Sequence, residues 1–165
     1  MAIKTSGIDH IHFNVLNLKR FREIMKQLFG PDITPIGYLE PHGMYNSCVS
    51  FADATAQTFL DVFQAASESS YVAEHIRQRG QGVSYVSFKV EDIEAAAAHA
   101  AKCGLTETSR IGYRGMKQVQ FDTYDELGFQ LEFVEYEPKF GEDLAKVKER
   151  LRAGETVDGL SYVEL

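Results

Sequence analysis

The chain carries the same short pattern twice, about seventy residues apart. Residues 8–15 (IDHIHFNV) return as residues 83–90 (VSYVSFKV), and residues 60–64 (LDVFQ) return as residues 131–135 (LEFVE). A unit that recurs in this way is usually a supersecondary module that cannot bury its apolar face alone and packs against its twin. The repetition therefore predicts two similar halves related by a pseudo-twofold axis, with a cleft between them.

Length and composition are compatible with this arrangement. A chain of 165 residues that is 44% hydrophobic and 25% charged is typical of one soluble globular domain, or of two intimately packed half-modules. The net charge of -7 argues against nucleic-acid or membrane-surface binding, because both need basic clusters.

Cys48 and Cys103 form no paired motif, and no segment is apolar enough for a signal sequence or a membrane span. We expect a cytoplasmic protein whose partner is a small molecule.

Each copy of the repeat is expected to contain one strand, one helix and three further strands. Alternation and helical spacing predict, in the first copy, a strand over 8–15, a helix over 18–30, a short strand before residue 38, and strands over 46–51 and 58–64 with a turn at 53–55. The second copy is expected to have a strand over 83–90, a helix over 92–102 and strands over 110–113, 118–121 and 129–135. A loop is expected over 40–43, and residues 159–165 are either an extra strand or a mobile end.

These elements predict an α+β fold made of two paired modules and a C-terminal helix. The first module is assigned to residues 1–66, a linker helix to residues 67–82, the second module to residues 83–137, and a C-terminal helix and tail to residues 138–165.

Residue types that bind metals recur at corresponding points of the two copies. In the strand over 8–15, alternation places His10 and His12 on one face and Asp9 on the other. Asp61 and Glu132 interrupt apolar strand runs, where an ionised carboxylate needs a partner or a metal. One imidazole and two carboxylates, from His10, Asp61 and Glu132, suit a divalent ion such as Mn, Mg, Co, Fe or Zn with open positions for substrate. The plainer alternatives are a histidine in the core and carboxylates that face solvent.

Other residues are candidates for substrate contacts. His12 should face the same cleft as His10 and is expected to bind substrate, support a ligand or replace one. Tyr85 stands at the second-copy position that corresponds to His10, where it is either a core aromatic residue or a substrate contact. Arg114 lies in the glycine-bearing loop over 112–115 and is a candidate contact for an anionic group, as are the neighbouring Arg110 and Lys117.

The repeated segments resemble the vicinal oxygen chelate superfamily, also called the glyoxalase/bleomycin-resistance/dioxygenase superfamily. Within it, the chain is most similar to methylmalonyl-CoA epimerases. The resemblance is carried by residues 8–11, 70–83, 112–115 and 131–135, and it extends over roughly residues 7–137. It implies paired βαβββ modules that form a cleft. It also implies that His10, Asp61 and Glu132 are metal ligands.

The chain departs from the family pattern at Tyr85, where epimerases, glyoxalases and ring-cleaving dioxygenases carry histidine. Three interpretations stay open: three residues and water hold the metal, Tyr85 binds as a phenolate, or the metal site is lost. Glu40 and His42 lie in the loop where the epimerases place a second acid/base group, so the resemblance makes them candidates for the catalytic base beside Glu132.

Three functional hypotheses follow. The first is a divalent-metal-dependent isomerase or lyase that acts through a chelated enolate, like methylmalonyl-CoA epimerase or glyoxalase I, on an acyl-CoA or an α-oxo compound. The second is a metal-free binding protein of the bleomycin-resistance type. An extradiol-type dioxygenase is less favoured, because its iron needs two histidines and Tyr85 removes one unless His12 substitutes for it. A homodimer is also expected.

Overall fold

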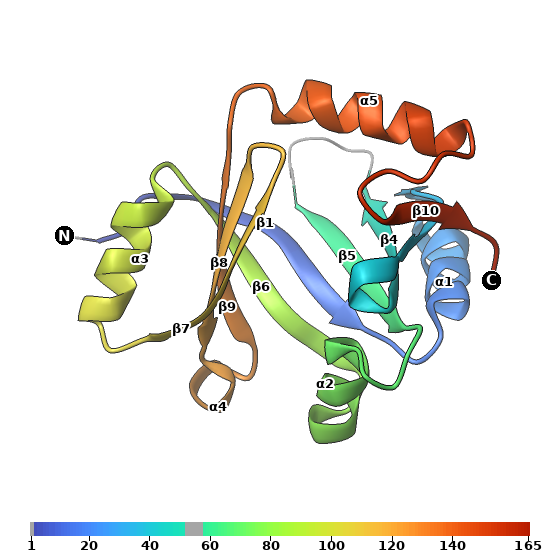
Figure 1. Ribbon diagram of the computed structural model, residues 1–165. Helices are drawn as coiled ribbons and strands as arrows, with labels where there is room; N and C mark the ends of the chain where they lie inside the picture. Colours follow the sequence, from blue (N-terminus) through green and yellow to red (C-terminus); the bar gives the residue numbers. More distant parts are fainter. Residues whose placement is uncertain (1, 52–57) are drawn as a thin grey trace.

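The computed structural model describes residues 2–51 and 58–165, and over these residues the chain builds one strongly curved mixed sheet with helices around it (Figure 1). The predicted turn at 53–55 lies outside the described residues. The first half contains β1 (Thr5–Asn14), α1 (Leu18–Phe29), β2 (Asp32–Ile33), β3 (Ile36–Leu39), the short 3-10 helix η1 (Glu40–His42), β4 (Met44–Ser50) and β5 (Phe59–Ala65). The helix α2 (Tyr71–Arg79) leads to the second half.

The second half repeats the order of the first. It contains β6 (Gly82–Val90), α3 (Ile93–Lys102), β7 (Thr106–Tyr113), β8 (Met116–Asp122), the short helix α4 (Tyr124–Leu127) and β9 (Gln130–Tyr136). The chain then forms α5 (Phe140–Arg152) and β10 (Leu160–Val163). The predicted elements are thus present within a few residues of their expected bounds. The one-turn helices η1 and α4 were not expected, because segments of three or four residues have no helical periodicity to detect.

The sheet order shows the repeat directly. Its strands run in the order β10-β3-β4-β5-β1-β6-β9-β8-β7. β1 and β6 pair antiparallel at the centre, β5 lies parallel to β1, and β9 lies parallel to β6. The order β1-β5-β4 on one side therefore corresponds to the order β6-β9-β8 on the other, as a pseudo-twofold axis between β1 and β6 requires.

Strand register brings the predicted site residues to this axis. Across β1 and β6, His10 lies opposite Ser87 and His12 lies opposite Tyr85. In the parallel pairs, Asp61 lies beside His12 and Glu132 lies beside Ser87. The two carboxylates thus occupy equivalent places on the outer flanks of the central strand pair.

Two β-bulges flank the axis at equivalent positions of the two copies. The pairing of β1 with β6 passes from Ile8 directly to His10, and from Tyr85 directly to Val83, which leaves Asp9 and Ser84 as the extra residues. A bulge places an extra residue in one strand and interrupts its alternation. The prediction that Asp9 lies on the face away from His10 is wrong for this reason, since its carboxylate contacts the His10 ring.

Each half has its own core on the helix-covered side of the sheet. In the first half, Leu18 of α1 packs against Val49 and Val62, and all three side chains are fully buried. In the second half, alanines of α3 let the helix approach Val119 and Phe133 closely. Asn17 and Asp92 cap these helices by accepting hydrogen bonds from backbone N–H groups in the first turn, which fixes where each helix begins. These cores leave the opposite face of β1 and β6 free for polar side chains.

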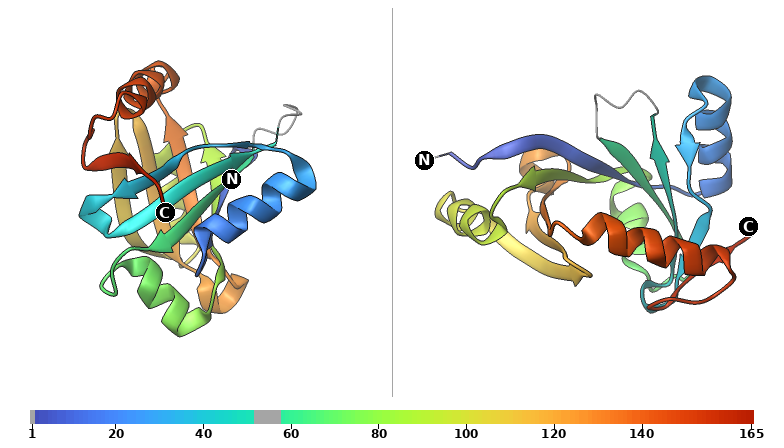
Figure 2. Two further views of the ribbon diagram at one scale, coloured as in Figure 1. Left: turned by 90° about the vertical axis from the view of Figure 1, so that its right-hand side faces the viewer. Right: turned by 90° about the horizontal axis from the view of Figure 1, so that it is seen from above.

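The C-terminal segment connects the two halves. After β9, α5 runs from the second half to the first, where β10 pairs antiparallel with the edge strand β3 (Figure 2). The tail is therefore an extra strand and not a mobile end. Over the described residues, no helix has the length and apolar character required to cross a membrane.

Candidate metal centre

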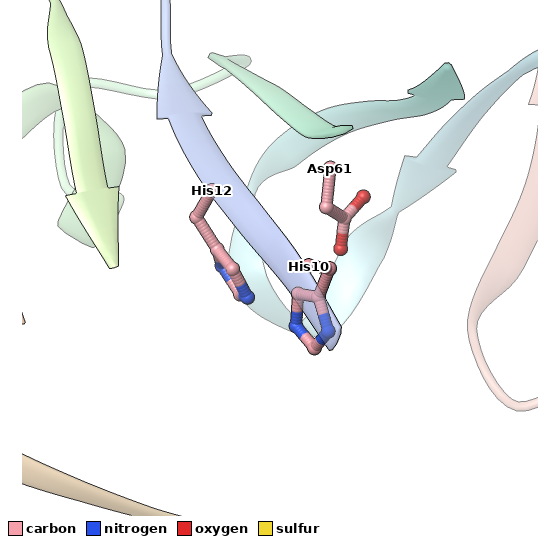
Figure 3. A group of neighbouring side chains, drawn as sticks. All are labelled: His10, His12 and Asp61. Atoms are coloured by element: carbon pink, nitrogen blue, oxygen red, sulfur yellow. The ribbon is translucent and has the colours of Figure 1, made fainter. Parts of the chain in front are cut away.

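Three side chains with metal-binding atoms converge at the centre of the sheet. His10 and His12 project from the same side of β1, and Asp61 reaches them from β5 (Figure 3). Their ligand atoms all lie within 4.8 Å of one another. Both imidazoles are buried and Asp61 is half-buried. His10 and His12 lie together because the two bulges leave the alternation between residues 10 and 12 of β1 intact.

Glu132 joins this group from the second half. Its Oε1 lies 3.3 Å from Nε2 of His10 and 3.6 Å from Nε2 of His12. The side chain is fully buried. Two imidazoles from one strand thus meet carboxylates from both halves, and we refer to His10, His12, Asp61 and Glu132 as the central cluster.

An outer layer of polar side chains holds Glu132. Gln118 and Gln120 of β8 donate to its two oxygens at 2.9 and 2.7 Å. With Nε2 of His10 3.3 Å from Oε1 as well, both oxygens of Glu132 have partners. Its position is therefore fixed before any metal binds.

Asp61 is held by the equivalent residues of the first half, but less completely. Asn46 and the Cys48 thiol of β4 both donate to Oδ1 of Asp61, the thiol at 3.4 Å. In each half the donors come from the residue opposite the carboxylate and from the residue two positions earlier on that strand. These four donors were not predicted from the sequence, although their i, i+2 spacing on strands was a readable signal.

A third carboxylate, that of Asp9, lies behind His10. Nδ1 of His10 is 2.8 Å from Oδ1 of Asp9, and the Tyr136 hydroxyl donates to the same oxygen at 2.7 Å. Neither Asp9 nor Tyr136 was predicted as a site residue from the sequence.

The charges of the cluster shift its protonation. Burial by itself lowers the pKa of His10, but the hydrogen bonds with Asp9 and Glu132 and the nearby charge of Asp61 outweigh it and raise the pKa to about 9. Burial alone would raise the pKa of Glu132, whereas its interactions with His10 and His12 lower it well below the usual range. His10 and Glu132 therefore form an ion pair at neutral pH.

Among the residues that the structure describes, several buried polar atoms near the cluster have no hydrogen-bond partner. They are both ring nitrogens of His12, both side-chain polar atoms of Asn14 and the hydroxyl of Ser87. Buried polar groups without partners are uncommon, because losing water without replacement is costly. An imidazole whose nitrogens are buried, unpaired and next to two carboxylates has the environment of a metal ligand. The residues present therefore fit a divalent ion.

Aromatic rings surround the imidazoles. Phe59 stacks on His10 with ring centroids 4.9 Å apart, and Phe63 stacks on His12 at 5.3 Å. Tyr85 lies 5.4 Å from the His12 ring. Burial, followed by the charges of Glu132 and Asp122, raises the pKa of Tyr85, which disfavours its phenolate form. Two predicted substrate-binding residues, His12 and Tyr85, thus lie at the centre of the site.

The remaining predicted site residues lie elsewhere on the surface. Glu40 and His42 are exposed on η1, and among the described residues their side chains form no hydrogen bond or ion pair with the central cluster. Arg114 lies in the turn between β7 and β8, where it pairs with Asp158 of the C-terminal segment at 2.8 Å. The structure therefore brings together His10, His12, Asp61, Tyr85 and Glu132, but not Glu40, His42 or Arg114.

The family can be assigned from this fold and its sequence. Residues 9–122 match the model of the glyoxalase/bleomycin resistance protein/dioxygenase superfamily. The chain belongs to this superfamily. The α+β architecture of paired βαβββ halves is accordingly the vicinal oxygen chelate fold, as predicted. Comparison with curated protein sequences gives no match.

Solved structures of methylmalonyl-CoA epimerases share this fold. The enzyme from Mycobacterium tuberculosis is 19% identical, with a TM-score of 0.71 over 86% of this chain and 95% of the epimerase. A Streptomyces coelicolor epimerase variant in complex with 2-nitronate-propionyl-CoA is 22% identical, with a TM-score of 0.68 over 81% of this chain and 99% of the other. A methylmalonyl-CoA epimerase in complex with methylmalonyl-CoA and NH4+ is 21% identical, with a TM-score of 0.69 over 82% and 97% of the two chains.

Proposed function

We propose that the chain is a divalent-metal-dependent isomerase or lyase that acts on a small substrate with neighbouring oxygen atoms, in the manner of methylmalonyl-CoA epimerase or glyoxalase I. The observation that carries this proposal is the convergence of His10, His12, Asp61 and Glu132 at the pseudo-twofold axis. Two imidazoles and two carboxylates form a mixed nitrogen and oxygen donor set that suits Mn, Co, Fe, Zn or Mg.

His12 supplies the imidazole that Tyr85 does not. The two residues lie opposite each other across β1 and β6, so a donor atom from His12 enters the same region of the cleft from the other strand. When bound, the metal would act as a Lewis acid on the substrate oxygens and favour an enolate. The fixed Glu132 would hold the metal and the aromatic rings would exclude water.

Proton transfer requires a carboxylate or another base with a free atom. Asp61 is half-buried, and both hydrogen bonds that it accepts go to Oδ1, so its Oδ2 has no hydrogen-bond partner among the described residues. That oxygen is the atom available to a metal, so we assign Asp61 as a ligand and not as the base. Glu40 and His42 stay predictions for this role, with Arg114 a predicted contact for an anionic substrate group. The tests are the substitutions Glu40→Gln, His42→Ala and Arg114→Met, each assayed for activity with metal content as the control.

The similar structures support an acyl-CoA or a related thioester as the first substrate class to test, since two of them hold methylmalonyl-CoA or 2-nitronate-propionyl-CoA. A cytoplasmic location and a homodimer are also part of the proposal. Light scattering of the purified protein measures whether it forms a homodimer.

Metal analysis is the primary experiment. The purified chain, reconstituted in turn with Mn, Co, Fe and Zn, should hold about one divalent ion per chain, bound by the four cluster residues. His10→Ala and Glu132→Ala should lose it. His42→Ala, which removes an exposed imidazole outside the cluster, is the matched control and should keep it. A native chain without metal would contradict the proposal and favour the metal-free binding protein of the bleomycin-resistance type.

The reaction type is tested by isotope exchange. In D₂O, the metal-loaded chain should exchange the α-proton of methylmalonyl-CoA or convert the glutathione adduct of methylglyoxal, because both reactions pass through an enolate. Exchange should be absent in Glu132→Ala. Metal binding without turnover of either compound would contradict these two substrate classes.

A second candidate function is that of an extradiol-type dioxygenase, which the presence of two histidines at the site favours. His10, His12 and one carboxylate together satisfy the two-histidine, one-carboxylate requirement of an iron-dependent dioxygenase. The test is oxygen consumption by the Fe(II)-loaded chain with catechol as the probe. Consumption that disappears in His12→Ala would support the extradiol-type activity over enolate chemistry, whereas no consumption would eliminate it for this probe.

A further inference from the structure

The hydrogen bonds behind His10 form a chain that ends at Tyr136. We propose that Asp9 and Tyr136 are positioning residues that orient His10 toward the metal and increase the metal affinity of the site. This inference rests on the proposed metal-dependent function. A carboxylate behind an imidazole ligand fixes which nitrogen carries the proton, holds the ring in place and increases the basicity of the ligand.

The geometry leaves only one nitrogen of His10 for a metal. Its Nδ1 is engaged by Oδ1 of Asp9 at 2.8 Å, and the Tyr136 hydroxyl donates to that oxygen at 2.7 Å. Nε2 faces Glu132 and the other donors instead. The Asp9 side chain is 10% exposed, so little water competes for its oxygens. The bulge at Asp9 makes this contact available.

Tyr136 is held in place independently of Asp9. Its ring stacks on Phe140 with centroids 4.7 Å apart, and the Lys89 ammonium lies 5.4 Å from the ring centroid. Removal of the hydroxyl alone should therefore leave the ring in position. Tyr136→Phe is for this reason a conservative test of the hydrogen bond.

The internal repeat provides a comparison within the same molecule. The second-copy residue that corresponds to Asp9 is Ser84, and the first-copy residue that corresponds to Tyr136 is Ala65. Within the described part of the chain, the Ser84 hydroxyl donates to the backbone carbonyl of His12 at 3.5 Å and forms no hydrogen bond with a carboxylate. The residue that corresponds to His10 is Tyr85, which is not an imidazole. The Asp9 and Tyr136 pair thus occurs where the repeat has a histidine and is lacking where it does not, as a role in orienting His10 requires.

The test measures the affinity for Zn²⁺ and Co²⁺ alone, by competition with a chromophoric chelator. Asp9→Asn should weaken binding by about 10- to 100-fold, the usual effect of losing such a partner. Tyr136→Phe should weaken it by roughly fivefold, the equivalent of about one net hydrogen bond. Asp32→Asn and Tyr45→Phe are the matched controls and should leave the metal affinity unchanged. Asp32 is exposed, and Tyr45 lies among the residues around the core of the first half.

A second readout separates orientation of the ligand from stability of the fold. In the Zn²⁺-loaded native chain, nitrogen NMR should show His10 protonated at Nδ1, and Asp9→Asn should shift that signal. A purely structural role would lower the melting temperature of both variants but leave the metal dissociation constant unchanged, which would overturn the inference. If metal binding disappears in His10→Ala and Glu132→Ala but persists undiminished in Asp9→Asn, only this inference fails. A native chain that binds no metal overturns the proposed function with it.

Discussion

At the residue scale, the strands β4 and β6 each contain a buried serine hydroxyl, and the two hydroxyls differ in their hydrogen bonding. Ser47 and Ser87 are both fully buried on strands. The Ser47 hydroxyl donates to the carbonyl of Thr34 at 2.9 Å, whereas the Ser87 hydroxyl has no hydrogen-bond partner within residues 2–51 and 58–165. A satisfied buried hydrogen bond contributes roughly 1 kcal/mol, and an unsatisfied buried group costs about as much or more.

Replacing each of these serines by alanine should change the free energy of unfolding in opposite directions. In the metal-free protein, Ser87→Ala should increase the free energy of unfolding by about 1 kcal/mol, and Ser47→Ala should decrease it by a similar amount. Urea denaturation measures both. Destabilisation by Ser87→Ala would show that the Ser87 hydroxyl is engaged, for example with a buried water.

The pKa of His10 gives a prediction for stability against pH. Because folding raises this pKa from 6.5 to about 9, protonated His10 stabilises the metal-free protein fully below pH 6.5, and this contribution is lost as the pH rises through 9. The difference in unfolding free energy between the native chain and His10→Ala should therefore shrink from pH 6.5 to 9. A constant difference for His10→Ala would contradict the ion pair with Glu132.

The sequence predicted some of these residues and not others, for identifiable reasons. Asp61 and Glu132 were predicted as a pair because they interrupt apolar strands at equivalent points of the repeat. Asp9 was placed on the wrong face because simple alternation cannot reveal a bulge, which depends on how β1 pairs with β6. Tyr136 was missed because it reaches Asp9 from 127 residues away.

At the scale of the element, β10 is the addition to the repeated modules. It covers β3, which would otherwise be the edge of the sheet. Its Leu160 packs over Gly37 of β3, where an added methyl group would lie 2.7 Å from Cδ1 of Leu160. The end of the Leu160 side chain thus occupies the space that a side chain at position 37 would need.

Gly37→Ala should consequently destabilise the protein by roughly 1–2 kcal/mol, because it overpacks the contact with β10. Gly112→Ala on β7 is the control and should have little effect, since nothing lies within 4 Å of the added atom. Thermal denaturation compares the two. Leu160→Ala in the Gly37→Ala background should restore part of the loss by making room, and a lack of coupling between the two sites would contradict the proposed contact.

The regular elements were largely predictable because their periodicity is local. The helix α1 and the strands around the axis follow from apolar spacing in the sequence, α3 from a run rich in alanine, and α5 from a strongly charged segment after Pro138. The fate of the tail was not predictable. Residues 160–163 form a strand because β3 offers an unpaired edge, and that edge exists only once the sheet has formed.

At the scale of the whole molecule, the central cluster joins the two halves. Its carboxylates come from β5 and β9, on opposite sides of the β1 and β6 pair. A metal that binds both carboxylates therefore stabilises the native arrangement of the halves, and it does so by mass action because the unfolded chain lacks the site.

A free divalent ion at about one hundred times its dissociation constant should add roughly 2.7 kcal/mol to the free energy of unfolding. Hydrogen exchange should slow in β1, β5, β6 and β9 together, and much less in the edge strand β7. Calorimetry and exchange mass spectrometry with and without a chelator measure these effects. Protection restricted to one half would contradict a site shared by both, and Glu132→Ala should remove the effect.

The doubled architecture, the regular elements and three members of the cluster could be predicted from the chain alone; these three are His10, Asp61 and Glu132. These follow from repetition and periodicity, which are properties of the chain in one dimension. Tertiary structure decided that His12 faces Tyr85, that Asp9 turns toward His10, that Gln118 and Gln120 hold Glu132, and that the tail completes the sheet. Those outcomes depend on strand register and bulges, which exist only when distant segments pair.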